Sequence, residues 1–343
     1  MKIAVTGLNA TDNPGPGVPV IRSLREADKD ISIVGLLYDA LEPGIYLEDI
    51  ADKSYLIPYP SSGLQSLFER LEYIHKKENI DIIIPTLDSE LYAFSKLADK
   101  LSSIGIETYL PTLEQLNIRA KDKLFDFCKE NEINVPKNIL ASSIQDLDLI
   151  KKDFEYPVVI KGIFYEAYIA NNKEEALTYF SKLSAKWGFP IIIQEFIKGT
   201  EFNVTALGDG TGNTIGAVPM RKLYITDKGK GWSGITINDN NLLEISKKII
   251  GISKWKSGLE LEYMKYKDEY YLLEINPRFP AWVYLATAAG MNMPYSLIEL
   301  AQGKKVKPME NYEVGKMFIR CSWDLISDIK KFEEISVKGE FTL

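Results

Sequence analysis

Blocks of apolar and polar residues alternate along the first third of the chain, in a pattern that predicts strands and helices in turn. The apolar runs are short and rich in isoleucine, valine and leucine, as in strands that are buried on both faces. Strands are expected at residues 2–6, 31–37 and 81–85, and helices at 18–27, 64–77 and 91–102. This alternation predicts a parallel sheet covered by helices.

The loop that follows the first predicted strand, from Gly7 to Gly17, is rich in residues that break regular structure. Sheets of this kind bind ligands at the carboxyl ends of their strands. Asp39 follows the second strand, where a ribose-binding acid of a dinucleotide fold lies, but the loop has no G-x-G-x-x-G pattern. Prolines beside Gly15 and Gly17 also lack N–H donors, which disfavours NAD binding.

Two acidic strands are predicted near the C-terminus, and the first covers residues 258–264. Side chains alternate between the two faces of a strand, so Glu260 and Glu262 share one face. The opposite face, expected in the core, carries Leu259, Leu261 and Tyr263. A turn at residues 267–269 leads into the second strand and predicts a hairpin.

The second acidic strand covers residues 271–278 and continues the same alternation. Leu273 and Ile275 are expected in the core, while Glu274 and Asn276 share the other face. Carboxylate and amide oxygens are ligands that Mg²⁺ accepts alongside water and substrate phosphates. Glu262, Glu274 and Asn276 are therefore candidate metal ligands. The alternative is that these residues form only the solvated face of an antiparallel hairpin.

Composition narrows the class of protein further. The chain has 343 residues, a net charge of −7 and no basic cluster, which disfavours nucleic acids and anionic membranes as partners. Two cysteines, Cys128 and Cys321, favour a reducing compartment, and we expect a cytoplasmic protein because no apolar run approaches the length of a membrane span. The single histidine, His75, makes a Ser-His-Asp triad or a multi-histidine metal site improbable.

The acidic strands resemble the metal-binding end of the ATP-grasp superfamily, which includes biotin carboxylase and carbamoyl-phosphate synthase. In that family one acidic residue, followed about a dozen positions later by Glu-x-Asn-x-Arg, holds Mg²⁺ ions that bridge the ATP phosphates. Glu262, Glu274, Asn276 and Arg278 match this order and spacing. The resemblance implies Mg²⁺ or Mn²⁺ at the first three and contact with a carboxylate or a phosphoryl group at Arg278.

The resemblance extends over nearly the whole chain and implies ATP-binding residues upstream. A long helix is expected at residues 112–129, in which Lys123 matches the basic residue that reaches the phosphates. Lys161, at the end of the next predicted strand, matches the strand lysine of the family. The alternatives are a solvated helix face for Lys123 and a simple strand end for Lys161.

Residues 191–204 predict two strands separated by a short hinge. In the resembling family the backbone of this hinge contacts adenine, and the acid after the glycine binds the ribose hydroxyls. The implied adenine contacts are Gln194, Glu195, Phe196 and Ile197, and the implied ribose ligand is Glu201.

A basic pair, Arg221 and Lys222, lies between the hinge and the acidic strands. We expect it to stabilise charge on a transferred phosphoryl group. The glycine-containing segment 226–234 that follows either closes over a ligand or forms an ordinary hairpin turn.

Two features depart from the family pattern. Lys161 is followed by a segment with one glycine, so Phe164 and Tyr165 are expected to cover the phosphates in place of a glycine-rich loop. The apolar residues 279–282, which end at Trp282, replace polar residues of bicarbonate-activating relatives. This favours an organic carboxylate as the substrate.

The resemblance therefore implies an ATP-grasp fold: an N-terminal parallel α/β domain at 1–112, a central lid at 113–198 and a C-terminal mixed-sheet domain at 199–343. The implied reaction uses ATP to convert a carboxylate into an acyl phosphate, which an amine attacks to form an amide or peptide-type bond. We expect small-molecule substrates, amino acids or peptides among them, and leave a homodimer open. The alternatives are a kinase of bicarbonate or carbamate and a nucleotide-binding regulatory protein with little turnover.

Overall fold

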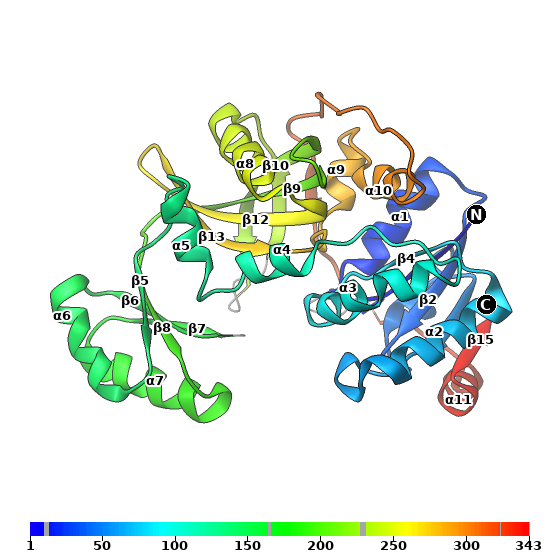
Figure 1. Cartoon of the computed structure of the whole chain (residues 1–343), viewed down its shortest axis with the longest axis horizontal. Helices are drawn as coiled ribbons and strands as arrows, with labels where there is room; N and C mark the ends of the chain where they lie inside the picture. Colours follow the sequence, from blue (N-terminus) through cyan, green and yellow to red (C-terminus); the bar gives the residue numbers. More distant parts are fainter. Residues whose placement is uncertain (10–13, 164–165, 227–230, 323, 343) are drawn as a thin grey trace. The chain divides into compact units, whose positions relative to one another are not determined.

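The computed structural model describes residues 1–9, 14–163, 166–226, 231–322 and 324–342 (Figure 1). Its contacts divide the chain into two compact units. The first unit comprises Met1–Leu116, Asn203–Glu260 and Asn276–Leu343, and the second comprises Asn117–Phe202 and Leu261–Ile275. The chain thus leaves the first unit and returns to it twice, while the division into 1–112, 113–198 and 199–343 stays a prediction.

The first unit begins with the predicted parallel sheet. Strands β1 (Lys2–Val5), β2 (Ser32–Leu37), β3 (Lys53–Leu56) and β4 (Ile82–Ile84) run parallel in the order β3-β2-β1-β4. The connecting helices include α1 (Gly17–Ala27), α2 (Leu64–Glu78) and α3 (Asp88–Ser102), and short 3-10 turns cover Pro43–Ile45 and Pro60–Ser62. The strands and helices predicted from the pattern of apolar residues are confirmed within a few residues at each end.

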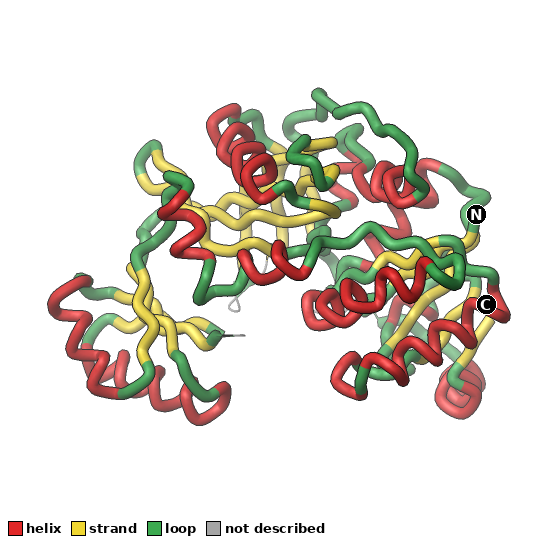
Figure 2. The backbone as a smooth tube through the Cα atoms, in the orientation of Figure 1, coloured by secondary structure: helices red, strands yellow, loops and turns green. Residues whose placement is uncertain are grey.

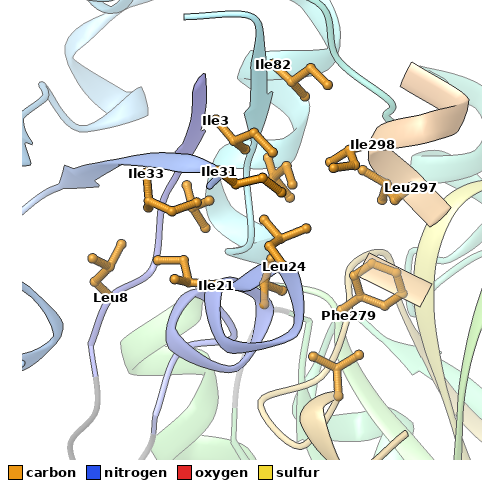
Figure 3. Packing of buried hydrophobic residues seen from close by; sticks show 14 of the residues in the cluster. Ile3, Leu8, Ile21, Leu24, Ile31, Ile33, Ile82, Phe279, Leu297 and Ile298 are labelled. Atoms are coloured by element: carbon orange, nitrogen blue, oxygen red, sulfur yellow. The ribbon is translucent and has the colours of Figure 1, made fainter. Parts of the chain in front are cut away.

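Both faces of this sheet are buried. On one face Ile3 packs with Ile21 and Leu24 of α1 and with Leu297 of α10 (Met293–Ala301) (Figure 3). On the other face Ala4 belongs to a second cluster with residues of α2 and α3. Successive residues of one strand therefore enter different cores, as the alternation of strand side chains requires.

The end of the chain adds a strand to this sheet that the sequence pattern did not indicate. Strand β15 (Glu340–Thr342) pairs antiparallel with β3 after helix α11 (Ile329–Lys338). Phe341 of β15 is buried in the core that contains Ile3. The C-terminal residues thus complete the N-terminal sheet.

A buried acid at the end of α2 is held by three donors. Glu78 accepts hydrogen bonds from the ammonium groups of Lys2 and Lys53, each at 2.9 Å, and from the hydroxyl of Tyr55 at 2.5 Å. Burial alone would raise the pKa of Glu78, but the hydrogen bonds from Tyr55, Lys2 and Lys53 outweigh it and lower the pKa to about 2. The charged form of Glu78 therefore stabilises the fold.

A second sheet has six strands in the order β13-β12-β9-β10-β11-β14. Strands are drawn in yellow in Figure 2. The strands of this sheet are β9 (Thr200–Asp209), β10 (Thr214–Ile225), β11 (Gly231–Thr236), β12 (Lys256–Tyr266), β13 (Glu269–Asn276) and β14 (Met317–Ile319). The helices of this part are α8 (Asn240–Ser253), which packs on β10, and α9 (Tyr284–Ala288). Strands β12 and β13 are sequence neighbours and sheet neighbours, which confirms the predicted acidic hairpin.

The second unit contains a separate antiparallel sheet in the order β5-β8-β6-β7. Its strands are β5 (Asn138–Ala141), β6 (Val158–Gly162), β7 (Ala167–Ala170) and β8 (Ile191–Glu195). Helix α7 (Lys173–Trp187) covers the sheet through Phe180 and Leu183, and α6 (Ile150–Asp153) follows a 3-10 turn at Ile144–Leu149. Across the described residues, no helix is long and apolar enough to cross a membrane.

The long helix expected at residues 112–129 is not formed. The structure has two short helices there, α4 (Leu113–Ile118) and α5 (Leu124–Glu130), joined by a turn at residues 119–123. The turn is closed by backbone hydrogen bonds from Ala120 N–H to the Asn117 carbonyl and from Lys123 N–H to the Ala120 carbonyl. This break changes which lysine of the segment faces the interior.

Candidate functional site

A cavity in the second unit gathers residues from five separate segments of the chain. Two lysines, Lys121 and Lys161, lie at its wall together with Gln194. The remaining wall is formed by Leu124, Phe125, Val135, Asn138, Ile192 and Leu273. The wall thus combines five apolar residues with two lysines and two side-chain amides.

Lys161 lies one residue before the end of strand β6 and is half-buried. Burial lowers the pKa of Lys161 to about 8; Glu274 and Glu262 oppose this effect, and Lys121 adds to it. Lys161 therefore interacts electrostatically with the two carboxylates that the sequence singled out as metal ligands. The structure brings these three predicted site residues together within one unit.

The hairpin of β12 and β13 supplies the carboxylates. Glu262 and Glu274 are half-buried, while Leu259, Leu261 and Tyr263 of β12 are buried as predicted. Leu273 departs from its expected place in the core, because it is half-buried and lines the cavity with Lys161. Strand β13 thus contributes Leu273 to the wall of the cavity, next to Glu274 in the sequence.

Lys121 is a residue that the sequence reasoning missed. It is half-buried and lines the cavity, whereas Lys123 is exposed and is not among the wall residues that the structure describes. Both lysines lie in the turn between α4 and α5. The helix expected at 112–129 did not predict that Lys121 and Lys123 differ in exposure. The turn between α4 and α5 directs Lys121 into the cavity.

The hinge between β8 and β9 lies in the same unit. Gln194 is buried, Glu195 and Glu201 are half-buried, and Ile197 is buried. Glu195 is tied to residue 137 by two hydrogen bonds: its backbone N–H donates to the Lys137 carbonyl at 2.8 Å, and its side chain accepts from the Lys137 N–H at 3.2 Å. These bonds hold the strand end that precedes the hinge.

Close packing explains the glycine of this hinge. A Cβ at Gly199 would collide with the carbonyl oxygen of Lys265 on β12. Phe202, just past the hinge, packs edge to face on Tyr270 of β13, with ring centroids 5.6 Å apart. The hinge is therefore fixed against the acidic hairpin inside the second unit, with Phe196 half-buried between β8 and β9.

The chemistry of these groups fits a nucleotide with a divalent cation. Within the ranges that the structure describes, no three His, Cys, Asp or Glu side chains form a metal cluster. Two carboxylates are nevertheless enough for Mg²⁺ when phosphate oxygens and water complete its shell. The ammonium groups of Lys161 and Lys121, two residues that line the cavity, provide the positive charge that phosphates require.

A second polar cluster, in the first unit, surrounds Glu260. Its carboxylate accepts hydrogen bonds from Asn203, Trp282 and Asn276, and it forms an ion pair with Arg278. Arg278 also pairs with Asp88 at the start of α3, at 3.2 Å. Asn276 is buried and Arg278 is half-buried, so both predicted site residues have fixed side chains.

The predicted basic pair lies on β10 of the first unit. Arg221 is exposed and Lys222 is half-buried, opposite Ile235 and Gly234 of β11. Residues 231–234 of the predicted covering segment are part of β11, and residues 227–230 lie outside the described residues, as do Phe164 and Tyr165. The roles of Arg221 and Lys222 stay predictions.

Another buried acid, Glu90, lies at the carboxyl ends of the strands of the parallel sheet. Glu90 is fully buried and accepts hydrogen bonds from the hydroxyls of Thr6 and Tyr38 and from the N–H groups of Thr86 and Leu87. Burial raises the pKa of Glu90 to about 7, and these hydrogen bonds oppose the rise. Glu90 therefore links residues that follow β1, β2 and β4.

Comparisons with known proteins find similarity in sequence and in fold. Residues 189–318 match a family model described as ATP-grasp in the biosynthetic pathway with Ter operon. In sequence the chain is 24% identical over 282 residues to the carbamoyl phosphate synthase large chain of Clostridium acetobutylicum, and 23% identical over 307 residues to that of Campylobacter jejuni. These matches cover 76% and 84% of this chain but 25% and 27% of the relatives, so the chain spans about a quarter of their length.

Solved structures show the same fold. A biotin carboxylase from Campylobacter jejuni in a beta-gamma-ATP complex superposes with a TM-score of 0.72 and 16% identity, over 92% of this chain and 74% of that one. The biotin carboxylase domain of 2-oxoglutarate carboxylase from Hydrogenobacter thermophilus, with MgADP and bicarbonate, gives a TM-score of 0.71 and 17% identity over 92% and 73%. A phosphoribosylglycinamide synthetase from Anaerococcus prevotii gives 0.63 and 17% over 92% and 79%.

The family model, the related sequences and the shared fold agree with the resemblance carried by Glu262, Glu274, Asn276 and Arg278. The predicted mixed α/β fold class is confirmed. The chain therefore resembles the ATP-grasp superfamily in the family model over residues 189–318, in related sequences and in fold.

Proposed function

We propose that this protein is a carboxylate–amine ligase that uses ATP and releases ADP. The γ-phosphoryl group of ATP is transferred to a substrate carboxylate, which gives an acyl phosphate. An amine then attacks the acyl carbon, and phosphate leaves as the amide or peptide-type bond forms. The observation that carries the proposal is the cavity of the second unit, where Lys121 and Lys161 lie with Gln194 and where Glu262 and Glu274 act on Lys161.

The nucleotide occupies this cavity in the proposal. Leu273 and the other apolar wall residues receive the adenine ring, and Gln194 lies at its edge. The backbone from Glu195 to Ile197 bonds the adenine, and Glu201 accepts the ribose hydroxyls. Lys161 and Lys121 hold the phosphates, since an ammonium group gains charge-assisted hydrogen bonds from phosphate oxygens.

Glu262, Glu274 and Asn276 are the proposed ligands of Mg²⁺ or Mn²⁺. A cation held by these residues would supply positive charge next to the phosphates. The protein residues carry the remaining tasks: Arg278 orients the substrate carboxylate, and Arg221 and Lys222 stabilise negative charge on the transferred group. Residues 113–198 act as a lid in this proposal, which keeps water from the acyl phosphate.

The second candidate is phosphorylation of bicarbonate or carbamate, which the related carbamoyl phosphate synthase sequences favour. Against it stand the apolar residues after Arg278: Phe279 and Trp282 are buried, and the indole N–H of Trp282 is engaged with Glu260. An organic carboxylate suits such surroundings better than a small hydrated anion. A regulatory protein with little turnover is the third candidate.

One assay separates the three candidates. The protein is incubated with MgATP, pooled amino acids and other carboxylates, and hydroxylamine as a general amine, and ADP, AMP and hydroxamate are measured together. A ligase produces ADP and hydroxamate in equal amounts, and splitting the pool identifies the acid. Bicarbonate-dependent ADP without hydroxamate supports the second candidate, and AMP contradicts acyl phosphate formation.

A matched pair of variants tests the site. Glu274→Gln removes a proposed cation ligand and is expected to lower turnover by at least about a hundredfold. Glu269→Gln, on the same strand but exposed, changes the same functional group and should leave turnover unchanged. Equal turnover in both variants would contradict the proposed site, and MgATP binding with no turnover for any acid would favour a regulatory protein.

A further inference from the structure

The carboxylate of Glu260 is buried among side-chain donors that replace water. Its Oε1 accepts hydrogen bonds from Asn203 Nδ2 and Trp282 Nε1, each at 2.7 Å. Its Oε2 accepts from Asn276 Nδ2 at 3.1 Å and from Arg278 at 3.2 Å. The residue is 6% exposed, and a carboxylate buried to this extent is tolerated only when charge and hydrogen bonds compensate.

The two oxygens of Glu260 have different tasks. The donors to Oε1 anchor the carboxylate, because neither Asn203 nor Trp282 is a proposed ligand of nucleotide or metal. Asn276 and Arg278, which both belong to the proposed site, donate to Oε2. We propose that Glu260 is a positioning residue that orients the Asn276 amide and the Arg278 guanidinium, an inference that rests on the proposed ligase function.

The effect on Asn276 follows from the geometry of a primary amide. The nitrogen and the oxygen of the amide point in different directions from the same carbon, and only the nitrogen donates. Because Nδ2 is bound to Glu260, the oxygen Oδ1 is turned away from that carboxylate. The opposite orientation would set two acceptors against each other. The negative charge of Glu260 thus selects the orientation in which Asn276 presents an oxygen elsewhere, as a cation ligand must.

The effect on Arg278 is to hold its guanidinium between two acids. One terminal nitrogen pairs with Glu260 and the other with Asp88, both at 3.2 Å. A planar guanidinium bound at both terminal nitrogens has a defined plane. Glu260 therefore sets the orientation of one residue for the cation and of another for the substrate carboxylate.

The isosteric variant Glu260→Gln tests this role. Both carboxylate oxygens of Glu260 accept hydrogen bonds, whereas a glutamine amide has one acceptor oxygen and one donor nitrogen. In the variant the nitrogen takes the place of one oxygen, and the hydrogen bonds that this oxygen accepted are lost. We expect Mn²⁺ affinity in the presence of ADP to fall by about 10- to 100-fold, the range seen when an outer partner of a metal ligand is lost. ADP affinity without metal should change less than about twofold. Free Mn²⁺ is measured by electron paramagnetic resonance, and ADP binding by calorimetry.

The control is Trp282→Phe, which removes a donor to Oε1 and leaves the bonds to Asn276 and Arg278 in place. Its Mn²⁺ affinity should stay within about threefold of that of the original protein. If Glu260→Gln does not fold, Glu260→Asp tests the same point, because the shorter side chain withdraws the carboxylate from Asn276. It should weaken Mn²⁺ binding by at least about threefold, with ADP binding unchanged.

The outcomes separate the two proposals. If the original protein binds neither ADP nor Mn²⁺ with ADP, the proposed function fails. If it binds both and the Glu260 variants bind Mn²⁺ equally well, the positioning role is refuted. The role is also refuted if metal-free ADP binding and Mn²⁺ binding weaken in parallel, or if Trp282→Phe loses as much Mn²⁺ affinity as Glu260→Gln.

Discussion

Replacing Lys121 and Lys123 one at a time by methionine tests which of the two lysines binds the phosphates. The resemblance to the family points to Lys123 as the phosphate-binding residue, whereas the cavity contains Lys121. Methionine keeps the apolar stem of lysine and removes only the ammonium group. The two positions lie two residues apart in one turn, so the variants are matched in length, charge change and local backbone.

The expected magnitudes differ because the two side chains differ in exposure. A half-buried ammonium group that donates to a phosphate oxygen contributes about 1.5–3 kcal/mol, which corresponds to about 10- to 150-fold in Kd. Removing Lys121 also relieves a repulsion on Lys161, which offsets part of this loss. The exposed charge of Lys123 is screened by water and contributes about 0–1 kcal/mol, or less than about fivefold.

The assay is calorimetric titration of ADP with Mg²⁺ into each variant, with the melting temperature recorded as a check on folding. Lys161→Met serves as the positive control, because it removes the other ammonium group of the cavity. Lys121→Met should weaken binding by at least about tenfold and Lys123→Met by less than about fivefold. The reverse order, or equal losses in both variants, would refute the assignment of Lys121 and restore the residue that the family pattern indicates.

Three further predictions concern stability and reactivity. The folded pKa of Glu78 is about 2 and lies below the reference value of 4.5, so its stabilisation is complete above pH 4.5 and is lost as the pH falls toward 2. Glu78→Gln should therefore lower the free energy of unfolding by about 1–3 kcal/mol at pH 7, and urea titrations should show this difference disappearing near pH 2. Gly199→Ala should lower the free energy of unfolding by about 1–3 kcal/mol, because the new Cβ meets a backbone carbonyl. Gly251→Ala, inside α8 and with room for a methyl group, should raise the melting temperature. Equal effects of the two substitutions would contradict the packing argument. Ellman's reagent should modify the exposed Cys321 quickly. Cys128 is buried, which raises its pKa to about 12, and it should react only after denaturation. Two fast-reacting thiols would show that Cys128 is accessible.

Local patterns in the sequence predicted much of the fold because they depend on neighbours along the chain. The strand and helix alternation of the first third and the acidic hairpin follow from periodicities of a few residues, which the printed sequence carries directly. The sequence also indicated Glu262, Glu274 and Lys161 as candidate site residues, because their positions in predicted strands match the spacing of a known family motif. The structure brings these three into one electrostatic group.

The places where sequence reasoning fell short depend on distant parts of the chain. The apolar and charged residues between 112 and 129 suit one helix, yet the chain turns at 119–123 and faces Lys121 inward. Strand β15 is too short to be recognised by its pattern and forms because β3 offers it an edge. Neither outcome is encoded in local periodicity.

Glu260 shows most clearly what each level determines. The sequence establishes that it lies two positions before Glu262 on the same predicted strand face, which does not assign it a role. Its donors come from positions 203, 276, 278 and 282, as far as 57 residues away. A buried carboxylate takes its role from the donors that surround it, and only the tertiary structure brings those donors together.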